Sequence, residues 1–288
     1  MKGETQMKRK TIAAAVLTVA LVAGIAGLSG CRGERRVAAR ATTQTQGMAF
    51  TIEIGGSTSV VPAIEVLAAR FQQENPQVRI NINGTGSSDG IRNAGSLYQL
   101  GMTSRDLTPG ELGLGLSERL IAIDGIAVIL HHSSPVENLS LDQIRGIYSG
   151  EISDWSEVHE GKSGAIAVFT REEGSGTRGA FEEMVGFSGF LRAGAIESPS
   201  TGAVRSGVGG NPAAIGYISA GSVDGSVRAV SVDYHEPTAA NMAAGLYRIA
   251  RPFILLHRDL HPATREFLDW ATGPEGQALV AASWVPIN

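Results

Sequence analysis

The chain of 288 residues is 43% hydrophobic and 18% charged, a composition typical of globular proteins with one or two domains. Residues 1–30 carry four basic groups and one acid, so the total net charge of −4 leaves −7 on the rest of the chain. Such an acidic chain lacks the basic surface typical of nucleic-acid-binding proteins, so we expect no nucleic-acid partner. Any anion site in it must depend on local dipoles and hydrogen bonds.

The first thirty residues have the pattern of a secretory signal peptide, with a basic start and an apolar run over residues 11–28. A bare membrane anchor is the competing interpretation. The run ends in Leu28-Ser29-Gly30-Cys31, which resembles the bacterial lipobox, in which the cysteine is lipidated and becomes the mature N-terminus. Cys31 is the only cysteine, which excludes an internal disulfide and a thiol active site elsewhere. An incidental cysteine after a signal peptide is the less favoured alternative.

The next residues predict a flexible tether, because residues 31–48 show no apolar periodicity. We therefore expect residues 1–30 to be a lipoprotein signal peptide and Cys31 to carry lipid such as palmitate. The protein would then be anchored to the cell membrane on its extracytoplasmic face. No second apolar run is long enough to suggest another membrane span.

The first half of the remaining chain predicts two units of strand, turn and helix. Residues 50–54 alternate as a strand does, and a Gly/Ser-rich turn leads to an apolar stripe from Ile64 to Phe71 at helical spacing. Residues 78–82 predict a second strand, followed by a second Gly/Ser-rich turn at 84–90 and a short helix.

The middle of the chain contains a predicted crossing between domains. A short apolar start near Leu100 ends in Ser104 and Arg105. The apolar runs 120–123 and 126–130 are separated only by Asp124-Gly125, which suggests one strand passing from one domain into another. A helix with Ser140 as its N-cap follows.

The segment Arg171–Phe181 has the composition of an anion site. It follows a predicted strand at residues 165–169 and consists of a glycine-rich turn with two hydroxyls before a helix start. The first turn of a helix has unpaired N–H groups and partial positive charge, and Arg171 adds a fork of donors. An ordinary capped helix remains the alternative for this segment taken alone.

The last third predicts a return to the first domain. Residues 186–210 are rich in Gly and Ser and predict no regular element. Strands are predicted at 213–219, 227–232 and 247–256, and helices near Pro262 and Pro274. Alternating strands and helices predict an α/β fold with mostly parallel sheets.

Three hydroxyl-rich turns lie where predicted strands end: Ser57–Ser59, Ser87–Ser88 and Ser175–Thr177. Ligands of α/β sheets bind beyond the carboxyl ends of strands. Three such turns, with Arg105 and Arg171, favour convergence on one anion over three independent helix caps.

Seven motifs in order resemble the phosphate-binding proteins of bacterial ABC transporters, in particular their shorter branch. They are GSTSVxP at 56–62, GxGSSxGI at 84–91, GMxSR at 101–105, DGIAV at 124–128, YSGEIxxW at 148–155, REEGSGTR at 171–178 and AIGYI at 214–218. The resemblance covers about residues 50–285.

The resemblance implies the two-lobed periplasmic-binding-protein (type II) fold, with each lobe a mostly parallel sheet flanked by helices. Lobe I would comprise residues 49–124 and 249–288, and lobe II residues 125–248, joined by a two-segment hinge. The family captures inorganic phosphate between the lobes and delivers it to a membrane permease driven by an ATPase.

The resemblance also implies the phosphate ligands, with one departure. The implied ligands are Thr58, Ser59, Ser87, Ser104, Arg105, Arg171, Ser175, Gly176 and Thr177. In long-chain members an aspartate accepts the phosphate proton, and Arg105 stands at the matching position here. Asp89, Asp106 and Glu173 are candidate replacements, although each is also explained as a solvated or dipole-capping carboxylate.

An exported phosphoryl-transfer or hydrolytic enzyme is the rival class. Glu173 stands where a nucleophile elbow around Ser175 needs glycine, and His257 and His261 lack a third metal ligand nearby. We therefore expect no catalytic residues, cofactor or metal, and a monomer in solution. Binding of another tetrahedral oxyanion, or a phosphate sensor in place of a transport receptor, remains an open alternative.

Overall fold

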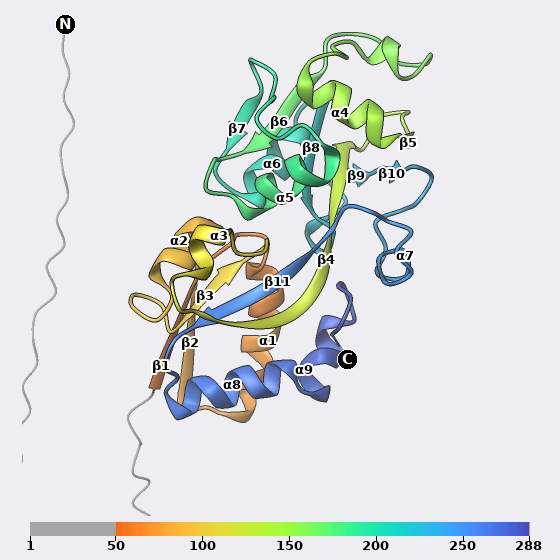
Figure 1. Cartoon of the computed structure of the whole chain (residues 1–288). Helices are drawn as coiled ribbons and strands as arrows, with labels where there is room; N and C mark the ends of the chain where they lie inside the picture. The colour runs from red at the N-terminus through yellow and green to blue at the C-terminus, as the bar shows by residue number, and fades with distance from the viewer. Residues whose placement is uncertain (1–49, 288) are drawn as a thin grey trace, which may run out of the picture. The chain divides into compact units, whose positions relative to one another are not determined.

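A mixed β-sheet of nine strands runs through residues 50–287, which are the residues that the structure, a computed structural model, describes (Figure 1). The predicted signal peptide, tether and Cys31 lie outside the described residues. Within residues 50–287, no helix has the length and apolar character needed to cross a membrane.

The strands and helices alternate along the chain. The strands are β1 (Phe50–Gly56), β2 (Val78–Gly84), β3 (Leu100–Thr103), β4 (Ser117–His131), β5 (Asn138–Leu139), β6 (Ala167–Arg171), β7 (Ile196–Ser198), β8 (Ala214–Ser219), β9 (Val227–Ala229), β10 (Ser231–Val232) and β11 (Ala250–His257). The α-helices are α1 (Val61–Glu74), α2 (Ser87–Asn93), α3 (Pro109–Leu112), α4 (Leu141–Ser149), α5 (Gly176–Val185), α6 (Thr201–Gly209), α7 (Ala239–Ala243), α8 (Pro262–Thr272) and α9 (Pro274–Val280). The 3₁₀ helices are η1 (Trp155–Glu157) and η2 (Ala220–Ser222).

The sheet has the strand order β2-β1-β3-β11-β4-β8-β6-β7, with β9 also paired to β4. Strand β1 is parallel to β2 and β3 at one end, and β6 is parallel to β7 and β8 at the other. In the middle, β11 runs antiparallel to β3 and β4, and β4 antiparallel to β8. The expected α/β fold is confirmed, but the sheet is mixed because the chain crosses its middle twice in opposite directions.

Two large apolar cores lie at the two ends of this sheet. The first contains side chains such as Ile54, Phe71 and Phe267, between the sheet and α1, α8 and α9. The second contains Trp155 and Phe181 among others, and is covered by α4 and α5. We call the parts of the chain around these cores the first lobe and the second lobe. Strand β4 extends through both, and β11 pairs with its first-lobe part, residues 117–125 (Figure 1).

Strand β4 serves both faces of the sheet in the second lobe. Ile126, Val128 and Leu130 belong to the main core, whereas Ala127 and Ile129 pack on the other face with residues of α6. This division follows from the two-residue period of a strand, which sends successive side chains to opposite faces. Residues 126–130, predicted as part of the strand that passes between domains, are therefore buried on both faces of the sheet.

Helix α6 and strand β7 lie in the segment 186–210, for which the sequence predicts no element. Three glycines between Thr201 and Gly209 lower the helix propensity of α6. The helix is stabilised instead by its N-cap, where the Ser200 hydroxyl accepts a hydrogen bond from the Ala203 amide at 3.1 Å, and by burial of Val204 and Val208. Tertiary packing thus overrides local propensity here.

Candidate functional site

Hydroxyl groups from the two lobes are in direct contact beyond the carboxyl ends of β1, β2 and β6. The Ser59 Oγ and Thr177 Oγ1 atoms lie 2.6 Å apart and share a hydrogen bond between the lobes. The Ser88 amide donates to the Gly174 carbonyl oxygen across the same junction, at 3.1 Å. The three predicted turns therefore meet at one place, which chance positions of three helix caps would not require.

Ser104, at the end of β3, joins the first-lobe side of this place. Ser57 Oγ donates to Ser104 Oγ at 2.8 Å, and Ser87 Oγ lies 3.4 Å from the same atom. All three side chains are buried. We call the following set the hydroxyl cradle: Ser57, Thr58, Ser59, Ser87, Ser104, Thr177 and Thr201.

The starts of helices α1 and α5 border the cradle from opposite lobes. Helix α1 begins at Val61, two residues after Ser59, without a side-chain cap. Helix α5 begins at Gly176, and its N-cap Ser175 accepts a hydrogen bond from the Arg178 amide at 3.3 Å. Unpaired amides and the positive end of each helix dipole face an anion favourably at such positions.

Gly176 is the point of closest approach between α5 and the first lobe. A Cβ atom there would lie 2.4 Å from Ser87 Oγ and 2.9 Å from Ser104 Oγ. These separations are shorter than carbon–oxygen contacts allow, so no larger residue fits without moving the lobes apart. The predicted site residue Gly176 thus contributes by having no side chain.

Arg171 ends β6 beside the cradle and is almost completely buried, with 1% of its surface exposed. Its Nε and Nη2 groups donate to the two carboxylate oxygens of Glu172 at 2.7 and 2.6 Å, and Nη1 donates to Thr201 Oγ1 at 3.2 Å. A guanidinium group has five N–H donors. One N–H on each terminal nitrogen therefore has no partner among the described residues and is available to an oxyanion, which guanidinium groups frequently bind bidentately.

Thr201, the first residue of α6, belongs to the cradle although the sequence did not single it out. Its hydroxyl lies 2.9 Å from Ser59 Oγ and 3.3 Å from Thr58 Oγ1, and its amide donates to Thr58 Oγ1 at 3.2 Å. The available signal was the Ser200-Thr201 pair ahead of Val204 and Val208, which have helical spacing.

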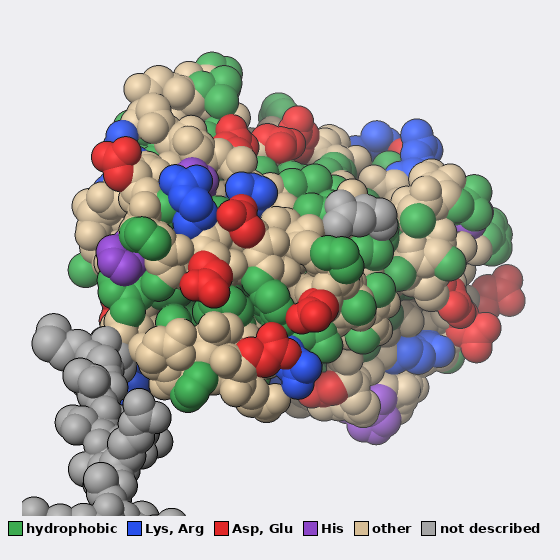
Figure 2. Space-filling view, turned by 90° about the horizontal axis from the view of Figure 1, so that it is seen from below, with side chains coloured by type: hydrophobic (Ala, Val, Ile, Leu, Met, Phe, Trp, Pro, Cys, Tyr) green, Lys and Arg blue, Asp and Glu red, His purple; other side chains and the backbone are tan. Residues whose placement is uncertain are grey.

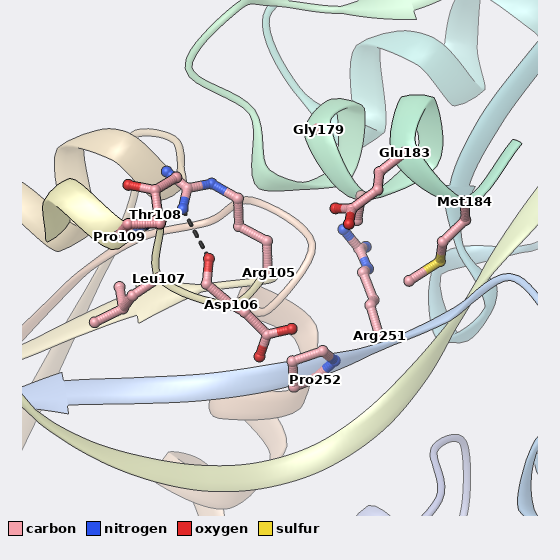
Figure 3. A pocket seen from close by; sticks show the side chains of 11 residues that line it. Arg105, Asp106, Leu107, Thr108, Pro109, Gly179, Glu183, Met184, Arg251 and Pro252 are labelled. Atoms are coloured by element: carbon pink, nitrogen blue, oxygen red, sulfur yellow. Dashed lines mark hydrogen bonds between the residues drawn. The ribbon is translucent and has the colours of Figure 1, made fainter. Parts of the chain in front are cut away.

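Arg105, predicted as a ligand, is not brought into the cradle. Both terminal nitrogens of its guanidinium donate to Glu111, at 2.7 and 2.8 Å, and Nη1 also donates to the Asp106 carbonyl oxygen. In Figure 3 the side chain lines a separate cavity of about 450 Å³ beside the cradle. Among the residues that line this cavity are Arg105–Pro109, Gly179, Ala180, Glu183, Met184, Arg251 and Pro252.

The three candidate proton acceptors also lie away from the cradle contacts. Asp89 accepts hydrogen bonds from Asn93 and from the Tyr98 hydroxyl. Asp106 and Glu173 are exposed to solvent. The carboxylate that does touch a cradle partner is Glu172, which holds Arg171 and lies against Gly86 of the first lobe.

A buried ion pair lies where the two long strands cross between the lobes. Arg251 of β11 is opposite Asp124 of β4 in the strand register, and its Nη2 lies 3.1 Å from Asp124 Oδ2. Ser219 Oγ donates to Asp124 at 2.7 Å, and Arg251 Nη1 donates to the Ser104 carbonyl oxygen at 3.2 Å. Burial raises the pKa of Asp124 to about 6, against the opposing effect of Arg251. The ion pair thus connects β4 and β11 to the cradle through Ser104.

Arginines in or beside the cradle are paired with carboxylates, which weakens the positive electrostatic potential around the cradle. Arg105 pairs with Glu111, Arg171 with Glu172 and Arg251 with Asp124. On the face shown in Figure 2, Lys and Arg side chains lie scattered among Asp and Glu and form no continuous basic surface. The cradle is therefore suited to hold an anion by hydrogen bonds and helix dipoles at short range.

The histidines of the β11 region have structural contacts. His261 is the N-cap of α8, where its Nδ1 accepts from the Ala263 amide, and its ring stacks on Phe50 at 3.8 Å. His257 Nδ1 contacts the Arg258 carbonyl oxygen at 2.7 Å. Within residues 50–287, no group of three or more His, Cys, Asp or Glu side chains is arranged to hold a metal ion.

The fold and the cradle between its lobes define a two-lobed binding protein, and comparisons with known proteins agree. The chain belongs to the PBP superfamily, because the model of the PBP superfamily domain matches residues 37–275. The resemblance inferred from the sequence motifs is confirmed: within this superfamily the chain is PstS-like.

Three similar proteins illustrate the relationship. A protein from Clostridium perfringens, assigned as a phosphate ABC transporter substrate-binding protein and solved with bound phosphate, is 43% identical with a TM-score of 0.80, covering 83% of this chain and all of that one. An ABC-type phosphate transport receptor from Vibrio cholerae is 34% identical with a TM-score of 0.67, covering 81% and 99%. The phosphate-binding protein PstS of Borreliella burgdorferi is 27% identical over 243 residues, covering 80% of this chain and 87% of the relative.

Proposed function

We propose that this protein is an extracytoplasmic receptor that binds inorganic phosphate between its two lobes and delivers it to an ABC permease for import. The observation that carries the proposal is the hydroxyl cradle, in which side chains of both lobes meet beside the buried Arg171. Two N–H groups of this arginine have no partner within residues 50–287. The phosphate-binding relatives support the choice of ligand.

The proposed ligand set combines donors of three kinds. Hydroxyls come from Thr58, Ser59, Ser87, Ser104, Ser175 and Thr177, backbone amides from Gly176 and Thr177, and a bidentate fork from Arg171. The Ser175 amide is not among the donors because it is bonded to the Glu172 carbonyl oxygen. We leave Arg105 out of the proposed set because its hydrogen bonds go to Glu111 and Asp106, which lie outside the cradle. Arg171, in contrast, donates to Thr201 of the cradle. The acceptor of a phosphate proton remains a prediction among Asp89, Asp106 and Glu173, to which the contact with Arg171 adds Glu172.

The proposed organisation follows from the same argument. Residues 49–124 and 249–288 would form one lobe and residues 125–248 the other, with a hinge in β4 and β11. We further propose that residues 1–30 are a signal peptide, that Cys31 is lipidated, and that the receptor acts as a non-catalytic monomer held at the membrane.

Isothermal titration calorimetry with phosphate, arsenate, sulfate and molybdate across pH tests the proposed function. We expect tight binding of phosphate and much weaker binding of sulfate. Equal binding of sulfate would mean that no carboxylate accepts a hydrogen bond from the phosphate proton. The protein would then be a general oxyanion receptor. Absence of binding by all four anions would refute the proposed site.

A further inference from the structure

The Thr201 hydroxyl occupies a particular place in the cradle. Its side chain is buried, and Oγ1 has three neighbours within hydrogen-bond distance: Ser59 and Thr58 of the first lobe and Arg171 of its own lobe. A hydroxyl can donate one hydrogen bond and accept two. Because Arg171 can only donate, Thr201 Oγ1 accepts one bond from it. Of the two first-lobe hydroxyls, Thr201 then donates to one and accepts from the other.

This arrangement makes Thr201 a saturated junction between the lobes. The Thr201 amide adds a further bond to Thr58 Oγ1, so residue 201 alone contributes three contacts across the junction. Thr177, which the motif analysis did identify, contributes one such side-chain contact, to Ser59. The same Thr201 hydroxyl also touches the arginine on which anion binding is proposed to depend.

The helix that carries Thr201 is held independently of these contacts. Its N-cap is Ser200, whose hydroxyl accepts from the Ala203 amide, and Val204 and Val208 anchor it in the second lobe. Removing the Thr201 hydroxyl should therefore leave α6 folded. The two roles, capping the helix and joining the lobes, are divided between neighbouring residues.

We propose that Thr201 is the closure latch of the two lobes, and that its hydroxyl sets how fast the closed form opens and releases its anion. Anion release by the latch rests on the proposed phosphate-binding function, but closure of the lobes can be measured without a ligand. Besides its bond from Arg171, the hydroxyl makes two bonds to the first lobe that exist only when the lobes meet. Their loss should act on opening more than on association.

Three variants separate the hydroxyl from other effects. Thr201→Val keeps the size of the side chain but not its hydroxyl, Thr201→Ser keeps the hydroxyl, and Ser200→Ala weakens the α6 cap without changing the latch. For Thr201→Val, stopped-flow measurement should give phosphate release about tenfold faster than in the wild type, with association changed by less than about threefold. Thr201→Ser should stay close to the wild type.

Amide hydrogen exchange without any added anion provides the second measurement. The Ser88 amide donates across the lobes to Gly174, at a place distant in sequence from Thr201, so its exchange reports opening. We expect Thr201→Val to accelerate exchange at Ser88 several-fold, and Ser200→Ala to accelerate exchange mainly within α6.

The outcomes distinguish the latch from the proposed function. Wild-type release and Ser88 exchange in Thr201→Val would overturn the latch, as would an equal effect of Thr201→Ser or Ser200→Ala. If the wild type binds no phosphate, the proposed function fails, while faster Ser88 exchange in Thr201→Val alone would still support the latch.

Discussion

At the scale of single residues, two arginines that follow β-strand ends have different surroundings. Arg171 is buried and donates to Thr201 of the cradle. The guanidinium of Arg105 is bonded to Glu111 and Asp106 and lies at the edge of a neighbouring cavity (Figure 3). Both have the sequence context of a hydroxyl-rich turn. Each guanidinium is paired with a glutamate, so their difference arises from where the pair lies. Glu172 holds Arg171 beside the cradle, and Glu111 holds Arg105 at the edge of the cavity.

Arg171→Ala should lower phosphate affinity by about 100-fold or more, because a buried anion would lose its charge-assisted pair. Arg105→Ala, the matched control, should change affinity by less than about threefold. Calorimetry on both variants checks this. Comparable losses in the two variants would show that Arg105 also reaches the anion.

Arg105 also lowers the pKa of Glu111. Hydrogen bonds from Arg105 are the largest cause that lowers the pKa of Glu111 to about 2 from its ordinary value of 4.5. Since the folded pKa lies below the unfolded one, the stabilisation is present above about pH 4.5 and is lost as the pH falls towards 2. In Arg105→Ala, stability should depend less on pH between 4.5 and 2, which urea unfolding across that range measures. An unchanged pH dependence would contradict this assignment.

At the scale of elements, the cradle depends on how closely α5 approaches the turn before α2. Neither Gly174 nor Gly176 has a positive φ, so both can become alanine without backbone strain. A new Cβ would lie 2.4 Å from Ser87 Oγ at Gly176, whereas at Gly174 its nearest neighbour would be Ser88 Cβ at 3.7 Å.

Gly176→Ala should therefore weaken phosphate binding by at least about tenfold while leaving the melting temperature unchanged or raised, since alanine favours a helix start over glycine. Gly174→Ala should bind normally. Calorimetry combined with thermal unfolding tests the pair of variants. Normal affinity in Gly176→Ala would mean that the lobes do not approach as closely in solution.

At the scale of the whole molecule, the hinge contains an ion pair that is completely removed from solvent. The Arg251 and Asp124 side chains are both 0% exposed, and together they join β4, β11, Ser219 and the Ser104 carbonyl. Buried pairs gain little net stability from their formation, but removing one partner leaves an uncompensated charge.

Asp124→Ala should therefore lower the free energy of unfolding by about 3–5 kcal/mol. Asp269→Ala, which breaks the solvent-exposed pair with Arg119, should cost less than about 1 kcal/mol. Urea unfolding of both variants measures the difference. A small effect at Asp124 would indicate that water or a shifted side chain compensates Arg251.

The sequence by itself determined the α/β class, the crossing strand around Asp124, and the convergence of three Gly/Ser-rich turns. These features depend on local periodicity and on the rule that strand ends gather at one edge of a sheet. Only the tertiary structure decided which polar side chains face the cradle. Thr201 is part of the cradle because burial of Val204 and Val208 holds the glycine-rich helix α6 in place. Arg105 lies outside the cradle, where its guanidinium is bonded to Glu111. Both outcomes depend on contacts between side chains, which local propensity does not encode.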